Sequence, residues 1–323
     1  MDYHYTRENK KALYLCSNKK DLENLTLARM YPYVVPTRDG WNMVNYLSIP
    51  PTHDISGRTD EPLPMVLLVH GGPWHRDTWG YSFLHQWLTS RGYVVISVNF
   101  RGSTGLGKDF TNAGNLEWGG KMHDDLIDTV EWAIREGIAD KEHIAIVGGS
   151  YGGYATLAGL TFTPDVFACG VDIVGPSNLR TLLDTLPSYW KPLMESMFTR
   201  IGDNRTEKGR QFLDSRSPLT YVNNICKPLL IGQGANDPRV KQSESDQIVE
   251  AMQAKAIPVT YVLYSDEGHG FKRPENRLSF FAVMESFLAE HLAGVAEPIG
   301  NDFDGSSIEI PVGTEEIPAL SDR

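Results

Sequence analysis

The sequence predicts an α/β fold with a mostly parallel sheet of about eight strands and helices on both faces. Two observations lead to this prediction. Short apolar runs recur through the middle of the chain, each followed closely by Gly, Asn or Ser, and segments with helical apolar spacing lie between them. A strand that helices cover on both faces is apolar along its whole length. Strands that alternate with helices form a parallel sheet joined by right-handed crossovers.

The expected strands begin with a hairpin and continue as apolar runs. The hairpin strands, at residues 31–36 and 41–49, flank Arg38-Asp39-Gly40, a turn signal that predicts antiparallel pairing. The apolar runs follow at residues 66–69, 93–98, 144–147, 169–174, 229–231 and 259–264. Helices are expected at 124–136, 243–256 and 278–292, because apolar residues return there every three or four positions.

These patterns divide the chain into three parts. We expect an N-terminal remnant at residues 1–30, one domain at 31–295 and an acidic C-terminal tail at 296–323. The tail has many breakers and little periodicity, so we expect it to be an extended surface segment or disordered. Residues 177–217 have no strand pattern and are rich in Leu and aromatic side chains. We expect a small helical insert there, either an ordinary crossover or a cap over a cleft, and the two interpretations are compatible.

Composition excludes several classes of protein. The chain has 323 residues, 41% of them hydrophobic, and no apolar run approaches the ~18 residues of a membrane span. The net charge of −11 disfavours nucleic acid and anionic membranes as partners. Cys16, Cys169 and Cys226 are odd in number and widely spaced, so we expect neither a disulfide framework nor a metal site. We also expect no cofactor. The first residues lack the apolar core of a secretory signal, which favours the cytoplasm. An oligomer is possible.

Ser150 is the candidate nucleophile. Gly148-Gly149-Ser150-Tyr151-Gly152-Gly153 follows an expected strand and precedes a helix of small residues. A G-x-S-x-G sequence in that position is the nucleophile elbow of the α/β-hydrolase fold, where glycines let the neighbouring backbone approach a strained serine. The alternative is a glycine-rich structural turn.

Serine requires a base, and two histidines follow Ser150 in the chain. His291 lies in the last expected helix, where a half-buried structural histidine is the natural interpretation. His269 lies in the loop after the strand at 259–264. Because parallel sheets place their chemistry at the carboxyl ends of strands, we predict that His269 is the base.

The base requires an orienting carboxylate, and the α/β-hydrolase order places it between serine and histidine. Asp237 follows the strand at 229–231, again at a carboxyl end, and we predict that it holds the imidazole. Three other acids compete. Asp203 lies in the helical insert, and Asp266 and Glu267 share the loop of the histidine.

The tetrahedral intermediate requires backbone N–H donors. We expect one from Tyr151, the residue after the nucleophile, and one from His70-Gly71-Gly72-Pro73-Trp74 after the third strand. Gly72 is favoured as this second donor and Gly71 is the near alternative. His70 belongs to the same turn, and we expect its role to be structural.

Five motifs in order give the chain a family resemblance. They are His70-Gly71-Gly72-Pro73, Asn99-Phe100-Arg101-Gly102-Ser103-Thr104-Gly105, Gly148-Gly149-Ser150-Tyr151-Gly152-Gly153-Tyr154, Asp237-Pro238-Arg239-Val240 and Gly268-His269-Gly270-Phe271. From about residue 27 to 292, the chain resembles the catalytic domain of the prolyl oligopeptidase family, most closely its dipeptidyl-peptidase and acylaminoacyl-peptidase branches. The resemblance implies an α/β-hydrolase fold and a Ser150, Asp237, His269 triad, with Tyr151 and Gly72 forming the oxyanion hole.

The resemblance also implies substrate contacts. Arg239 falls where the family binds a substrate carbonyl or carboxylate, although a salt bridge within its own loop is an equal alternative. Four residues fall around the acyl-side pocket: Pro176, Leu179, Leu182 and Val240. We expect Arg101 to be structural.

The family normally carries a β-propeller before this domain. Here about 30 residues precede the hairpin, and residues 1–16 resemble the last strand of such a propeller. We therefore expect either a fragment of a longer protein or a free-standing hydrolase. The predicted function is a serine peptidase that works through an acyl-enzyme, and the alternative is a carboxylesterase acting on small acyl or aryl esters. Peptide and ester carbonyls pass through similar tetrahedral intermediates, so the chemistry of the site does not choose between the two. The expected substrate is therefore a peptide or a small ester.

Overall fold

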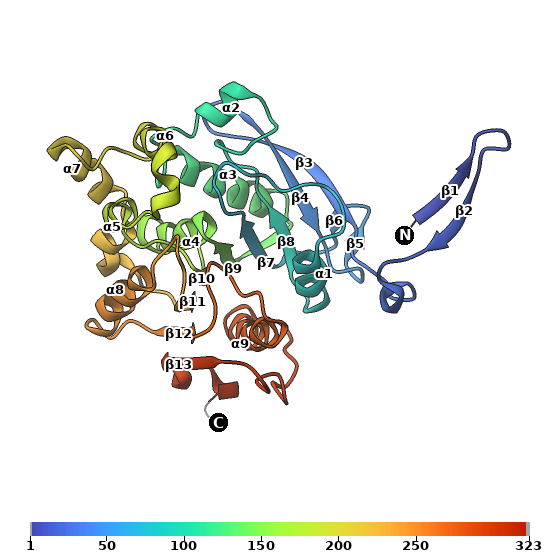
Figure 1. Cartoon of the computed structure of the whole chain (residues 1–323). Helices are drawn as coiled ribbons and strands as arrows, with labels where there is room; N and C mark the ends of the chain where they lie inside the picture. Colours follow the sequence, from blue (N-terminus) through green and yellow to red (C-terminus); the bar gives the residue numbers. More distant parts are fainter. Residues whose placement is uncertain (1, 321–323) are drawn as a thin grey trace.

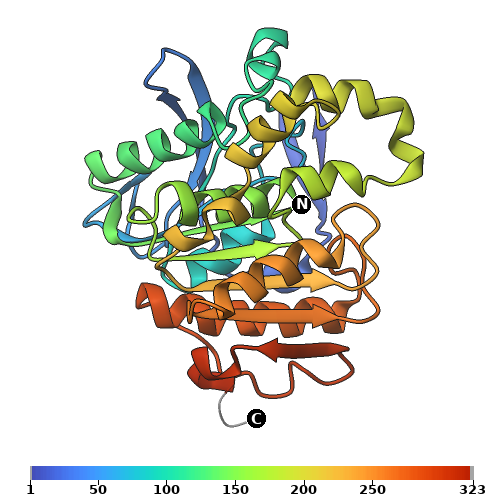
Figure 2. The same cartoon turned by 90° about the vertical axis from the view of Figure 1, so that its left-hand side faces the viewer.

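A computed structural model describes residues 2–320, and within this range the central sheet has nine strands (Figures 1 and 2). Their order across the sheet is β13-β12-β11-β10-β9-β7-β8-β4-β3. The strands are β3 (Met30–Pro36), β4 (Asn42–Ser48), β7 (Leu63–Val69), β8 (Val94–Ser97), β9 (Ala139–Gly149), β10 (Cys169–Ile173), β11 (Leu229–Gly234), β12 (Val259–Tyr264) and β13 (Ile308–Val312). Neighbours from β8 across to β12 run parallel, and β3, β4 and β13 pair antiparallel. The predicted α/β fold with a mostly parallel sheet is confirmed.

The ninth strand corrects the expected count of eight. β13 lies in the segment that we expected to be extended on the surface or disordered, and it pairs with β12. Beyond it, Ile317 and Leu320 are buried in the core. The sheet therefore extends past the domain boundary predicted at residue 295. In β13 apolar residues alternate with Glu309 and Pro311, a pattern suited to an edge strand but too short to identify in an acidic segment.

Helices cover both faces of the sheet. Side chains of β7 alternate between two cores: Met65, Leu67 and Val69 enter one, and Val66 and Leu68 enter the other. The first core includes α3 (Lys121–Arg135), α4 (Tyr151–Phe162) and α8 (Gln242–Gln253), and the second includes α1 (Phe83–Ser90) and α9 (Pro274–Leu292). A short helix, α2 (Lys108–Asn112), precedes α3. Burial on both faces explains why the strands are apolar throughout.

The predicted helical insert lies between β10 and β11. It consists of α5 (Leu179–Asp184), η2 (Ser188–Leu193), α6 (Met194–Arg200), α7 (Glu207–Ser215) and η3 (Pro218–Asn224). Its helices lie toward the carboxyl ends of the parallel strands (Figure 2). The insert therefore borders the edge of the sheet where the candidate site residues are expected.

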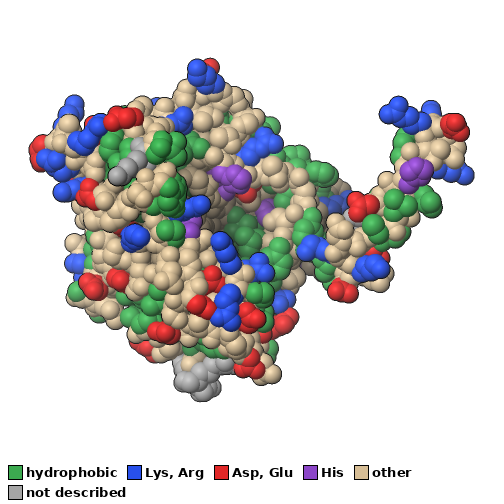
Figure 3. Space-filling model, viewed as in Figure 1, with side chains coloured by type: hydrophobic (Ala, Val, Ile, Leu, Met, Phe, Trp, Pro, Cys, Tyr) green, Lys and Arg blue, Asp and Glu red, His purple; other side chains and the backbone are tan. Residues whose placement is uncertain are grey.

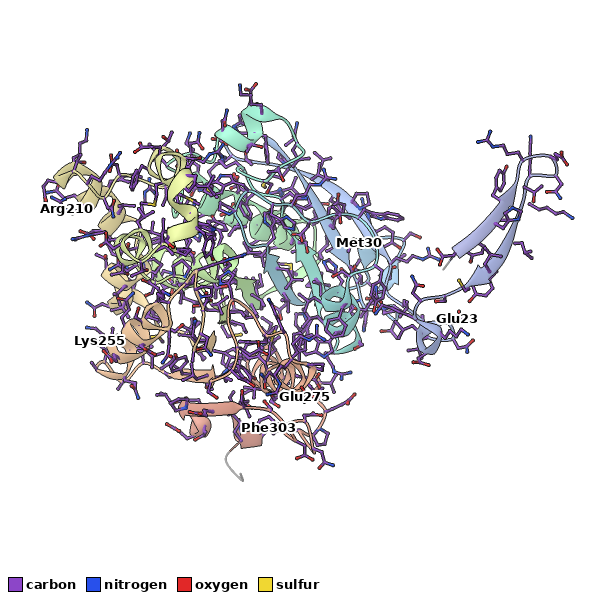
Figure 4. All side chains as sticks on the ribbon, viewed as in Figure 1. Glu23, Met30, Arg210, Lys255, Glu275 and Phe303 are labelled. Atoms are coloured by element: carbon purple, nitrogen blue, oxygen red, sulfur yellow. The ribbon has the colours of Figure 1, made fainter. Side chains whose placement is uncertain are left out.

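The N-terminal part of the chain stands away from this body. β1 (Asp2–Thr6) and β2 (Lys11–Cys16) form an antiparallel hairpin whose residues are almost all exposed. Figures 1 and 4 show the hairpin projecting from the body, with Glu23 in the connecting segment and Met30 at the body. Residue 1 of the predicted remnant and residues 321–323 of the predicted tail lie outside the described range. A minor ribbon, β5 (Asp54–Ile55) with β6 (Arg58–Thr59), and two short turns, η4 (Thr314–Glu316) and η5 (Pro318–Leu320), complete the described elements together with η1 (Lys20–Leu22).

Candidate active site

Ser150 occupies a strained turn between β9 and α4. Its backbone has φ 59° and ψ −117°. Residues other than glycine rarely adopt a positive φ of this kind. The Ser150 N–H donates to the carbonyl oxygen of Ile173 at 2.8 Å, which ties the turn to β10. A Cβ on Gly152 would overlap the carbonyl oxygen of Val69, so the glycine after the nucleophile is required for the close approach of α4 to β7. The structure thus contains the predicted nucleophile elbow geometry.

His269 lies in the loop after β12, and its side chain reaches Ser150, which follows β9. Its Nε2 is 3.0 Å from Ser150 Oγ, and its Nδ1 is 2.6 Å from Oδ2 of Asp237. Since a carboxylate can only accept, Nδ1–H donates to Asp237 and the free Nε2 accepts the hydroxyl hydrogen of Ser150. The three side chains form one continuous line of hydrogen bonds.

Asp237 is buried in the loop after β11. Its second oxygen, Oδ1, accepts the backbone N–H groups of Arg239 at 2.8 Å and Val240 at 3.0 Å. Both oxygens of the carboxylate therefore have partners, which fixes its orientation toward the imidazole.

The competing acids have other partners. Asp203 pairs with Arg205 in the insert. Asp266 pairs with the guanidinium of Arg273, and Glu267 accepts the backbone N–H groups at the start of α9. The structure brings Asp237, and none of these three acids, to the imidazole.

The two expected oxyanion donors lie next to Ser150. Tyr151 is the first residue of α4, where backbone N–H groups have no partner within the helix. Gly72 lines the same cavity as Ser150, Tyr151 and His269, whereas Gly71 does not. Among the described residues, no acceptor takes the N–H of Gly72. The backbone N–H groups of Tyr151 and Gly72 therefore have no acceptor among the described residues.

A cavity of about 340 Å³ opens beside Ser150. Of the residues expected around the acyl-side pocket, Pro176, Leu182 and Val240 line it, and so does Arg239. Leu179 does not. It is completely buried in the hydrophobic core at the start of α5.

Several lining residues were not assigned from the sequence. The insert contributes an apolar wall made of Leu186, Trp190, Leu193, Met197 and Ile201. Loops of the main domain contribute Trp74 and Trp118. The signal for the first five was the Leu-rich and aromatic composition of residues 177–217. The cap interpretation of that segment was therefore correct in placing it over a cleft, while its individual contacts depend on packing that the pattern does not specify.

Two guanidinium groups lie at or near the cavity without a carboxylate partner among the described residues. Arg239 is exposed, and its guanidinium lies 5.9 Å from the ring centroid of Trp190; that of Arg200 lies 5.1 Å from the ring of Trp74. Neither guanidinium makes an ion pair with a carboxylate of residues 2–320. The predicted alternative for Arg239, a salt bridge within its own loop, is therefore absent from the described part of the chain. Figure 3 shows a hollow on this face, surrounded by histidine, basic and hydrophobic side chains.

Other features do not compete with this site. A larger cavity of about 650 Å³ lies between the segment before β3 and α1, but none of the triad residues lines it. Over the described range, no group of three His, Cys, Asp or Glu side chains is arranged to hold a metal ion, and no helix there is both long and apolar enough to cross a membrane.

Comparisons with known proteins show the family of the chain. Residues 79–295 match the prolyl oligopeptidase family. The chain is 61% identical over 322 residues to dipeptidyl aminopeptidase BIII of Pseudoxanthomonas mexicana, covering 99% of this chain and 47% of the relative. It is 47% identical over 331 residues to dipeptidyl peptidase family member 6 of Caenorhabditis elegans, covering 97% and 45%. The chain thus spans about half the length of these curated relatives.

Solved structures share the fold. A puromycin-hydrolyzing peptidase of Mycobacterium tuberculosis superposes with a TM-score of 0.76 at 29% identity, covering 84% of this chain and 40% of that one. An acylaminoacyl peptidase of Pyrococcus horikoshii gives 0.77 at 24% identity, covering 89% and 46%. With the family match over residues 79–295 and the α/β-hydrolase architecture around Ser150, this chain belongs to the prolyl oligopeptidase family of serine peptidases.

Proposed function

We propose that this chain cleaves peptide bonds through an acyl-enzyme formed on Ser150. The observation that carries the proposal is the line of hydrogen bonds from Ser150 Oγ to His269 and on to Asp237. Ser150 and His269 line a largely apolar cavity. His269 Nε2 takes the hydroxyl proton as Ser150 Oγ attacks the substrate carbonyl. The N–H groups of Tyr151 and Gly72 bind the resulting oxyanion.

The second half of the cycle uses the same groups. The imidazolium of His269 gives its proton to the leaving amine, the peptide bond breaks, and the acyl group remains on Ser150. The imidazole then takes a proton from a water molecule as the water oxygen attacks the acyl carbonyl. The imidazolium returns this proton to Ser150 Oγ, the bond between Oγ and the acyl carbon breaks, and the acid leaves. Asp237 stays ionised and holds the imidazole in the required tautomer.

The substrate that we propose is a peptide with an apolar residue on the acyl side of the cleaved bond. The cavity beside Ser150 is lined by Leu182, Val240 and Trp190, which suit such a side chain. Arg239 is exposed at this cavity without an acidic partner and can donate to the preceding substrate carbonyl. One relative is named a dipeptidyl aminopeptidase and another a dipeptidyl peptidase family member, so release of an N-terminal dipeptide is the proposed specificity.

We include a reducing cytoplasm in the proposal as the compartment of action. Cys169 is buried and free, and Cys16 and Cys226 are exposed and free in the described structure. Free exposed thiols are typical of reducing compartments.

Three chromogenic substrates test the proposal in one assay. They are Ala-Leu-p-nitroanilide, its N-acetylated form and p-nitrophenyl butyrate. We expect the highest kcat/KM for the free dipeptide anilide, since its leucine fills the cavity. A higher value for the acetylated anilide would contradict dipeptide release. An ester cleaved far faster than both anilides would instead establish the carboxylesterase alternative.

A further inference from the structure

One family motif has no role in the site described above. Residues 99–105 follow β8, and their loop lies against the turn at residues 70–74, which we call the oxyanion loop. Arg101 anchors the motif: its guanidinium is almost completely buried and donates to the carboxylates of both Asp39 and Asp125. The expected structural role of Arg101 agrees with these contacts. The motif is thus a fixed platform beside the oxyanion loop.

His70 links the platform to the oxyanion loop. Its Nδ1 lies 2.8 Å from the carbonyl oxygen of Gly71, and its Nε2 lies 2.9 Å from Oγ of Ser103. The imidazole also stacks on Phe100, with ring centroids 4.5 Å apart and planes 19° apart. Two of these contacts come from the platform, and His75 adds an edge-on ring contact with centroids 5.9 Å apart.

These contacts determine where the protons are. A carbonyl oxygen can only accept, so His70 Nδ1 carries hydrogen and donates to Gly71. Burial lowers the pKa of His70 to about 4, which keeps the imidazole neutral at pH 7. Nε2 is then an acceptor, and the Ser103 hydroxyl donates to it. Ser103 is fully buried, and its backbone N–H donates to the carbonyl of Phe100, so the backbone that carries the hydroxyl is itself held in place.

The Gly71 carbonyl belongs to the same peptide unit as the Gly72 N–H. This peptide bond is trans, so its C=O and N–H point in opposite directions within one plane. Holding the carbonyl on the His70 side therefore directs the N–H to the other side, where Gly72 lines the cavity with Ser150. Glycine at both positions leaves this plane otherwise free to rotate.

We propose that His70 is a positioning residue for the oxyanion hole, in which Ser103 fixes the imidazole and the imidazole fixes the Gly71–Gly72 peptide plane so that the Gly72 N–H faces the substrate oxygen. The inference rests on the proposed function, because it concerns how that function obtains its second donor. It also gives the motif at residues 99–105 a role in catalysis through geometry. His70 itself does not touch the substrate.

Such a role affects the transition state more than substrate binding. Negative charge on the substrate oxygen develops only as Ser150 attacks, and one donor in such a site is worth roughly 10²–10³-fold in kcat. If the Gly71–Gly72 peptide plane rotates, the Gly72 N–H no longer faces the oxyanion, and much of this rate factor is lost. We expect kcat to fall about 10- to 100-fold with KM within about threefold of wild type.

Two amide variants separate positioning from packing. In His70→Asn, the side-chain NH₂ takes approximately the place of Nδ1 and can still donate to Gly71. In His70→Gln, the amide reaches toward Ser103 and loses the carbonyl. Kinetics are measured with the substrate that turns over best, together with inhibition by a peptide boronic acid, whose tetrahedral adduct on Ser150 places an oxygen in the oxyanion hole. Thermal melting monitors the fold of each variant.

We expect His70→Asn, which keeps the bond to Gly71 but not the one to Ser103, to lose no more than several-fold in kcat. We expect His70→Gln to lose about 10- to 100-fold in kcat, with KM nearly constant and boronate affinity lower by the same factor. Wild-type kcat in His70→Gln overturns the inference. Equal losses of kcat in His70→Asn and His70→Gln, together with lower melting temperatures, also overturn the inference. They would show that His70 acts only through its packing in the fold. If both fold poorly, Ser103→Ala decides: a several-fold loss of kcat at unchanged KM supports the inference, and unchanged kcat overturns it.

The outcome for the proposed function is separate. Wild-type protein that hydrolyses none of the substrates and forms no boronate adduct would contradict the proposed function. Wild-type protein that is active, with a fully active His70→Gln variant, contradicts only the role of His70.

Discussion

Asp237 holds the imidazole of His269 through a single oxygen: Oδ2 lies 2.6 Å from Nδ1, while Oδ1 is occupied by two backbone N–H groups. The carboxylate therefore does two things. It fixes the shape of its own loop, and it determines which nitrogen of the imidazole carries the proton.

Asp237→Asn separates these two effects. The amide oxygen can still accept the backbone N–H groups, but the NH₂ then faces Nδ1 and forces the proton onto Nε2. That nitrogen can no longer accept the Ser150 proton, so we expect kcat to fall by about 10⁴-fold. Steady-state kinetics measure the loss, and thermal melting should show a folded protein.

The matched control is Asp266→Asn. Asp266 lies in the same region but pairs with Arg273, away from the imidazole. Its turnover should stay close to wild type. Near-normal turnover of Asp237→Asn would show that another group orients His269.

The two glycines on either side of the Ser150-Tyr151 pair differ in the space around them. A Cβ on Gly152 would overlap the carbonyl oxygen of Val69, whereas a Cβ on Gly149 would meet nothing closer than 3.7 Å. We expect Gly152→Ala to displace Ser150 and lower kcat/KM by roughly 100-fold or more, and Gly149→Ala to stay within a few-fold of wild type. Equal effects of the two substitutions would contradict the assigned packing of α4 against β7.

The C-terminal segment contributes to stability. Ile317 is fully buried in the core that includes α9, and we expect Ile317→Ala to lower the free energy of unfolding by roughly 2–4 kcal/mol. Ile55, which is 62% exposed, provides the control, and Ile55→Ala should change it by less than about 0.5 kcal/mol. Denaturant titrations measure both. A negligible effect of Ile317→Ala would mean that the segment does not pack as described.

Asp172 makes stability depend on pH. It is fully buried in β10; one carboxylate oxygen accepts the Gly175 N–H at 2.8 Å and the other has no partner in the described structure. Burial raises the pKa of Asp172 to about 7. Between pH 4 and 7 the unfolded chain has lost this proton and the folded chain keeps it, so wild-type stability falls as pH rises, by up to ~1.4 kcal/mol per pH unit from this group.

Asp172→Asn removes that titration. Its unfolding free energy relative to wild type should therefore rise from pH 4 to 7 and level off above pH 7. Urea denaturation of both proteins at five or six pH values measures the difference. A constant difference across this range would refute the assignment.

The triad could be predicted from the sequence because each member lies in the turn or loop that follows a strand. Ser150, Asp237 and His269 come after β9, β11 and β12, and the carboxyl ends of parallel strands meet at one edge of the sheet. Chain order and strand pattern were therefore sufficient to predict which side chains lie together.

Contacts that depend on tertiary packing could not be predicted in this way. Trp190 and Met197 belong to an insert without strand periodicity, so nothing local indicates which side faces the cavity. The family resemblance places Leu179 around the cavity, yet the orientation of α5 buries it in the core. The bond from Ser103 to His70 joins two loops 33 positions apart, and neither loop contains a pattern that predicts it.

The central claim is that Ser150 is the nucleophile of this chain, and covalent labelling tests it most directly. Wild-type and Ser150→Ala proteins are treated with a fluorophosphonate, and intact mass spectrometry counts the phosphonyl groups added to each. We predict one group on wild type, mapped to Ser150 by peptide sequencing, and none on Ser150→Ala or on heat-denatured wild type. Labelling of Ser150→Ala at the wild-type rate would contradict the account.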